Sequence, residues 1–119
     1  REFWALERIG IGWSRFTFDC GLGSLMREPG VWDERQAAKL DALLDYQASF
    51  GVTPLAVLGP GMPKWASRAP KGSSAARAYT HKKSANAHFT NYLNRLIDLA
   101  DGRLYAIETW NEPDIPLFY

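Results

Sequence analysis

The sequence contains a single cysteine, Cys20, and two histidines among its 119 residues. One thiol cannot form an internal disulfide, and His81 and His88 are too few and too isolated for a metal site, so we expect neither a metal nor a cofactor. The chain also lacks the roughly 18 consecutive apolar residues that a membrane-spanning helix needs. We expect no membrane partner.

Neither sign of charge is in excess. Fourteen Lys and Arg face thirteen Asp and Glu, for a formal net charge of +1. This balance gives no electrostatic footprint for nucleic acid or for an anionic membrane. The sequence does not predict an oligomeric state.

The chain begins with Arg1 and has neither an initiator methionine nor a signal peptide, which we interpret as the start of a fragment. No compartment follows from this, and an extracytoplasmic one is favoured only slightly. The apolar share of 46% and the charged share of 23% are typical of one globular domain, which we assign to residues 1–119. Five tryptophans stand out, because tryptophan in loops is also a residue that stacks on sugars.

Helix-like and strand-like segments alternate along the chain. Residues 3–8 resemble the end of a helix, and residues 9–16 form a short β-branched and aromatic strand. Asp33 is expected to cap a helix, with Gln36 completing a capping box and Gly51 following the last turn.

The second half continues this alternation. Residues 52–58 are the second strand, with Pro54 tolerable near its start. Residues 59–83 form a long loop, residues 84–100 an amphipathic helix that includes Ile97 on its apolar face, and residues 103–110 the third strand.

Alternating strands and helices predict an α/β fold with parallel strands joined by crossover helices. Two architectures fit: a small doubly wound sheet, or part of a (β/α)₈ barrel. Parallel strands need cover on both faces, and a sheet of three strands would leave apolar edges open. The barrel slice is therefore the better interpretation.

Glu112 stands just after the third strand, where barrel enzymes place their chemistry. Glycoside hydrolysis needs two carboxyl groups, one of which donates a proton to the leaving oxygen. Trp110 and Pro113 would partly exclude water from Glu112 and raise its pKa, and Asn111 is suited to bind a sugar hydroxyl. The alternative is a turn in which Glu112 is merely solvated.

Residues 107–114, Ile-Glu-Thr-Trp-Asn-Glu-Pro-Asp, resemble the fourth-strand motif of the clan A glycoside hydrolases, and most of all family 39, which holds β-xylosidases and α-L-iduronidases. Four upstream segments resemble that clan in the same order: residues 12–15 (Gly-Trp-Ser-Arg), 30–33 (Gly-Val-Trp-Asp), 51–55 (Gly-Val-Thr-Pro-Leu) and 63–66 (Pro-Lys-Trp-Ala). The resemblance covers nearly the whole chain.

The resemblance implies a retaining glycosidase that acts on a carbohydrate substrate, with a fragment of a (β/α)₈ TIM barrel covering about strands two to four. Glu112 would be the general acid/base, Asn111 would contact the sugar 2-hydroxyl, and Arg15 would lie beside the nucleophile. No residue of this chain matches the second catalytic glutamate, which belongs to strand seven of the clan. The alternative function is a barrel that binds carbohydrate without hydrolysing it.

Several other residues have two interpretations. Arg15 either orients a nucleophile or pairs with a carboxylate such as Glu108. Trp65 is either a sugar platform or ordinary loop packing, and His81 is a weaker candidate for substrate contact. Trp32 is expected to anchor the helix that follows it, and Trp4 and Trp13 to lie in the core.

A set of basic residues falls within the long loop. A solvated loop explains it better than a preference for an anionic sugar does. The set comprises Arg68, Lys71, Arg77, Lys82 and Lys83.

Overall fold

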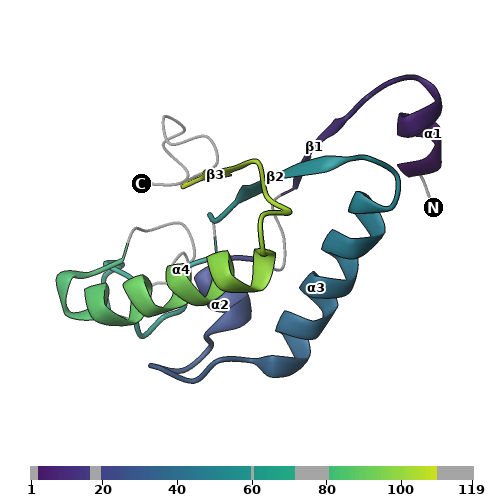
Figure 1. The fold of residues 1–119 in the computed structure, drawn as a ribbon. Helices are drawn as coiled ribbons and strands as arrows, with labels where there is room; N and C mark the ends of the chain where they lie inside the picture. The colour runs from purple at the N-terminus through teal and green to yellow at the C-terminus, as the bar shows by residue number, and fades with distance from the viewer. Residues whose placement is uncertain (1–2, 17–19, 60, 72–80, 110–119) are drawn as a thin grey trace.

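The computed structural model describes residues 3–16, 20–59, 61–71 and 81–109 (Figure 1). Within these ranges no helix has the length and apolarity to cross a bilayer. The elements, in chain order, are α1 (Phe3–Arg8), β1 (Trp13–Phe16), α2 (Leu22–Leu25), α3 (Glu34–Ala48), β2 (Thr53–Val57), the short 3₁₀ helix η2 (Lys83–Ala85), α4 (Asn86–Ala100) and β3 (Ala106–Glu108).

The three strands form one parallel sheet in the order β1-β2-β3. This confirms the predicted α/β fold with parallel strands. Helices α3 and α4 connect the strands, and both lie on the same side of the sheet in Figure 1. The sheet therefore has one face that these helices cover and one that neither of them covers.

Helix α3 begins where its capping signal predicts. The Asp33 carboxylate accepts a hydrogen bond from the Gln36 backbone N–H at 2.9 Å, which satisfies one free donor of the first turn. The reciprocal half of the capping box is absent, because the Asp33 N–H donates to the Leu25 carbonyl at 2.8 Å instead. The helix start is thus tied to α2, a short helix that the sequence pattern did not predict.

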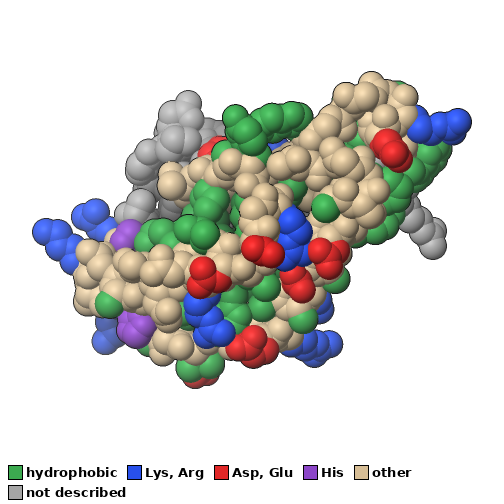
Figure 2. All heavy atoms as spheres, viewed as in Figure 1, with side chains coloured by type: hydrophobic (Ala, Val, Ile, Leu, Met, Phe, Trp, Pro, Cys, Tyr) green, Lys and Arg blue, Asp and Glu red, His purple; other side chains and the backbone are tan. Residues whose placement is uncertain are grey.

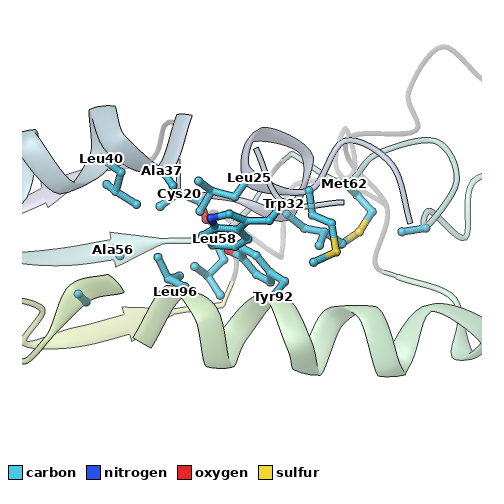
Figure 3. Packing of buried hydrophobic residues seen from close by; sticks show 14 of the residues in the cluster. Cys20, Leu25, Trp32, Ala37, Leu40, Ala56, Leu58, Met62, Tyr92 and Leu96 are labelled. Atoms are coloured by element: carbon cyan, nitrogen blue, oxygen red, sulfur yellow. Dashed lines mark hydrogen bonds between the residues drawn. The ribbon is translucent and has the colours of Figure 1, made fainter. Parts of the chain in front are cut away.

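The apolar core is formed by α2, α3, α4, β2 and the segments that follow β1 and β2 (Figure 3). Leu40 and Leu44 of α3 and Tyr92 and Leu96 of α4 belong to this core, and all four side chains are almost fully buried. Ile97, predicted on the apolar face of α4, is 55% exposed, because the buried stripe runs through Tyr92, Leu96 and Ala100.

The Tyr92 hydroxyl is buried in this core and is hydrogen-bonded there. The Tyr92 hydroxyl donates to the Cys20 carbonyl at 2.5 Å, and the Cys20 thiol donates to the Val57 carbonyl at 3.3 Å. Burial, and secondarily the proximity of Cys20, raises the pKa of Tyr92 well above its ordinary value. This chain of contacts joins α4, the segment after β1, and the end of β2.

Two tryptophans expected in the core are half exposed. Trp13 lies in β1 on the face away from α3 and α4 and is 53% exposed. Trp4, in α1, is 50% exposed, with the Arg8 guanidinium 5.8 Å from its ring centre. Trp32, which was expected to anchor the helix that follows it, is buried, with the Arg95 guanidinium 4.6 Å from its ring centre.

Glycines allow the segments after β1 and β2 to touch through their backbones. A Cβ added at Gly21 would lie 2.7 Å from the Leu58 carbonyl oxygen, and one at Gly23 would lie 2.0 Å from the Gly61 carbonyl oxygen. Real Cβ atoms do not approach so closely, so only glycine fits without a shift of the backbone. Both contacts lie beyond the carboxyl ends of the strands.

Arg103 holds the C-terminal end of α4 against α3. Its guanidinium pairs with Asp45 and with Asp41, the latter at 2.5 Å, and also donates to the Leu99 carbonyl at 2.6 Å. The hydrogen bond that Arg103 donates to the Asp41 carboxylate is the main cause that raises the pKa of Arg103. A cation is well placed here, because the last carbonyls of a helix carry partial negative charge.

We expect Arg103→Gln to lower the free energy of unfolding by about 2 kcal/mol, since several charge-assisted hydrogen bonds would be lost. Urea denaturation of the variant and of the parent measures the change. Arg35→Gln, an exposed position on α3, serves as the control and should change stability by less than about 0.5 kcal/mol. Equal effects of the two substitutions would contradict the bridging role of Arg103.

Candidate functional site

The carboxyl ends of the three parallel strands meet at one edge of the sheet. Arg15 is the third residue of β1, and Glu108 is the last residue of β3. In the strand register Arg15 pairs with Leu55, and Glu108 pairs with Val57 two residues later. Since side chains alternate between faces, Arg15 and Glu108 project from the same face of the sheet.

Arg15 and Glu108 form a two-pronged ion pair across β2. The Arg15 Nε donates to Oε2 of Glu108 at 2.9 Å, and Nη2 donates to Oε1 at 2.8 Å. The two residues are 93 positions apart in the chain and come from the outer strands of the sheet. Fork-to-fork geometry fixes the plane of the guanidinium as well as its position.

This face is the one that α3 and α4 leave open. The Arg15 side chain is 46% exposed and the Glu108 side chain 35% exposed. Trp13 lies on the same face beside Tyr105, with a distance of 3.9 Å between their ring centres. Ala56 and Ile107, which point the other way, belong to the core and its margin.

The ion pair determines the charge state of Glu108. Its hydrogen bonds to Arg15, more than simple charge attraction, lower the pKa of the Glu108 carboxyl. A carboxyl with a lowered pKa is ionised at neutral pH and cannot act as a proton donor there. Of the two glutamates in residues 107–114, Glu108 is thus the one unsuited to general acid catalysis.

The predicted acid/base Glu112 and the predicted sugar ligand Asn111 lie outside the described residues, as do Trp110 and Pro113.

Trp65 packs into the loop that follows β2. Its indole lies against the core cluster and meets the His88 ring edge to face, with 5.4 Å between ring centres. The indole N–H is buried and has no hydrogen-bond partner among the described residues. This is the loop packing that one interpretation of Trp65 anticipated. Its role as a sugar platform stays a prediction.

His81 lies ahead of η2, five residues before α4 begins at Asn86. Its ring is parallel to that of Phe89, with centres 4.4 Å apart, and its Nε2 is 3.0 Å from Oδ1 of Asn86. A β-bridge to Ser67 holds its backbone. These contacts give His81 a structural place at the start of the helix, and contact with substrate stays a prediction.

Among the residues described, no three His, Cys, Asp or Glu side chains gather in a way that could hold a metal ion. Sequence reasoning did not identify the backbone contacts of Gly21 and Gly23 at the same edge of the sheet. The available signal was a pair of Gly-x-Gly sequences, one after each of the first two strands, at residues 21–23 and 59–61.

No protein-family model matches this chain, and no curated protein sequence does either. Solved structures do. One of them, an apo structure of a β-glucosidase named β-glucosidase 1317, superposes with a TM-score of 0.71 at 19% sequence identity. The match covers 96% of this chain and 26% of that one. The likeness shows the fold alone. The chain is thus similar in fold to about a quarter of a β-glucosidase.

We expect the pKa of Glu108 to return toward the ordinary value of a glutamate in Arg15→Gln, because the hydrogen bonds that lower it would be lost. Carboxyl ¹³C NMR titration of both proteins measures this pKa. The ion pair should stabilise the fold at neutral pH, and this stabilisation should disappear as the pH falls through the lowered pKa, where Glu108 takes up a proton. An unchanged Glu108 titration in Arg15→Gln would contradict the pairing.

Proposed function

We propose that this chain is part of the catalytic domain of a retaining O-glycoside hydrolase. Its three strands would correspond to about strands two to four of a (β/α)₈ barrel. The observation that carries the proposal is the Arg15–Glu108 pair, built at the carboxyl edge of a parallel sheet on the face opposite α3 and α4. In a barrel this face is the interior, and this edge carries the active site.

The similarity in fold to a β-glucosidase supports the same proposal. The fold alone does not indicate a substrate, but the sequence does: residues 107–114 resemble the motif of clan A glycoside hydrolases and, within that clan, of family 39. A carbohydrate is therefore the proposed substrate.

In the proposed mechanism Glu112 protonates the glycosidic oxygen while a second carboxylate attacks the anomeric carbon. Glu112 then removes a proton from the water that releases the sugar from the enzyme. The two carboxyl groups of a retaining enzyme lie about 5 Å apart. We assign no residue of 1–119 to the nucleophile.

Arg15 and Glu108 have supporting parts in this proposal. Glu108 holds the Arg15 guanidinium in a fixed plane. By resemblance to the clan, the charge of Arg15 would stand beside the nucleophile. A positive charge there would keep the attacking carboxylate ionised. Asn111 is the proposed ligand of the sugar 2-hydroxyl.

We expect Glu112→Gln in the intact protein to lower the rate of hydrolysis about 10²–10⁴-fold for glycosides with poor leaving groups. The loss should be much smaller for an activated aryl glycoside, because its leaving group departs without a proton. Initial rates on the two substrates measure the difference.

Asp114→Asn is the matched control, a neighbouring carboxylate with no part in the proposed chemistry. It should retain the parent's rates on both substrates. Parent-like activity of Glu112→Gln on the poor leaving group would refute the acid/base assignment. A parent protein that binds sugars without cleaving them would instead support the non-catalytic barrel.

A further inference from the structure

The net charge of +1 conceals a strong separation of charge along the chain. Residues 46–97 contain seven Lys and Arg and no Asp or Glu. The remaining residues contain the other seven cations together with all thirteen carboxylates. Segregation of this kind creates a local field that the net charge does not report.

Five of the cations in residues 46–97 lie on described parts of the segment between β2 and α4, and all five are exposed: Lys64, Arg68, Lys71, Lys82 and Lys83. We call these five residues the basic surface. The two ends of the segment are joined by a β-bridge between Ser67 and His81 and by a hydrogen bond of 2.7 Å from the Lys82 N–H to the Ala66 carbonyl. Arg68 and Lys82 each follow one partner of this bridge, so both lie one residue from it along the chain.

Figure 2 shows the result on one side of the molecule. Lys and Arg side chains gather without Asp or Glu beside the histidines at the end where α4 begins, whereas over α3 and the other end of α4 Asp and Glu are interspersed with Lys and Arg. The positive end of the α4 dipole adds to the same field.

Nothing in the described structure neutralises the basic surface. The ion pairs found among the described residues involve Arg15, Arg27, Arg95 and Arg103, none of which belongs to it. Side-chain cations that are left without carboxylates repel one another, and an external polyanion would relieve this repulsion.

From sequence alone a solvated loop is the better interpretation of these cations. Because the structure ties both sides of the segment together and pairs none of the five cations with a described carboxylate, we propose that the basic surface is a docking site for an acidic polysaccharide, one that carries carboxylates along its length. The proposal rests on the proposed function, because the segment leads away from the carboxyl end of β2, the edge assigned to sugar chemistry. The basic surface would be a second, non-catalytic contact between the protein and the polysaccharide. Its five cations stand on the connecting segment, whereas Arg15 and Glu108 stand on the strands. Four of the five are lysines, which act as point charges and suit a flexible chain of separated carboxylates.

The test measures binding of fluorescent polygalacturonate to the intact protein by anisotropy at several salt concentrations. Neutral dextran and a DNA duplex at equal charge concentration serve as comparison ligands. Arg68→Gln/Lys82→Gln/Lys83→Gln removes three cations of the basic surface. Arg8→Gln/Arg35→Gln/Lys39→Gln removes three exposed cations elsewhere and is the matched control.

We expect polygalacturonate to bind in a salt-dependent manner and dextran not to bind by this surface. Binding at low salt should weaken about tenfold in the first triple variant and by less than about twofold in the control. Equal losses in the two variants, or no binding by the parent, would overturn the proposal. Tighter binding of DNA than of polygalacturonate would also overturn it, in favour of a nucleic-acid partner.

Hydrolysis of a small neutral glycoside separates this proposal from the proposed function. The first triple variant should hydrolyse it at the parent's rate, because none of its three positions belongs to the proposed catalytic site. Glu112→Gln should bind polygalacturonate as the parent does. A variant that loses polygalacturonate binding but keeps hydrolysis therefore tests the basic surface alone. A variant that loses hydrolysis but keeps polygalacturonate binding tests the role of Glu112 alone.

Discussion

Parallel neighbours in a sheet cannot be joined by a tight turn, so each strand must be followed by a crossover before the next one begins. Crossovers of one hand place α3 and α4 on the same side of β1-β2-β3. The core forms on that side, around Leu44 and Leu96. The opposite face is left to Trp13, Arg15 and Glu108, so the placement of the polar pair follows from the connection rule.

The two glutamates of residues 107–114 differ in what surrounds them. Glu108 is on the strand and is pinned by a guanidinium, which fixes its negative charge. Glu112 has Trp110 and Pro113 as chain neighbours and no such partner is proposed for it. A carboxyl with a lowered pKa is a poor proton donor at neutral pH, so the proposed acid/base role goes to Glu112 and not to Glu108.

Much of the architecture was predictable, because local signals determine it. Asp33 caps α3 by contacts three residues away, and strand–helix alternation predicts parallel pairing. Helix α2 was missed because four residues are too few to show a period. The exposure of Trp13 and of Ile97 depends on which face each element buries, and hydrophobicity alone does not reveal that. The ion pairs of Arg103 could not be predicted without knowing how α3 and α4 pack together, since its partners are about sixty positions away in the chain.

The Gly23 contact with Gly61 has a consequence for how this sequence can change over time. Every other amino acid carries a Cβ, and a Cβ at Gly23 would lie 2.0 Å from a backbone oxygen that cannot rotate away. No other amino acid can therefore replace Gly23 without a shift of the backbone. At Leu44, by contrast, another aliphatic side chain can fill the space. In related sequences we therefore expect core residues such as Leu44 to vary more than Gly23 does.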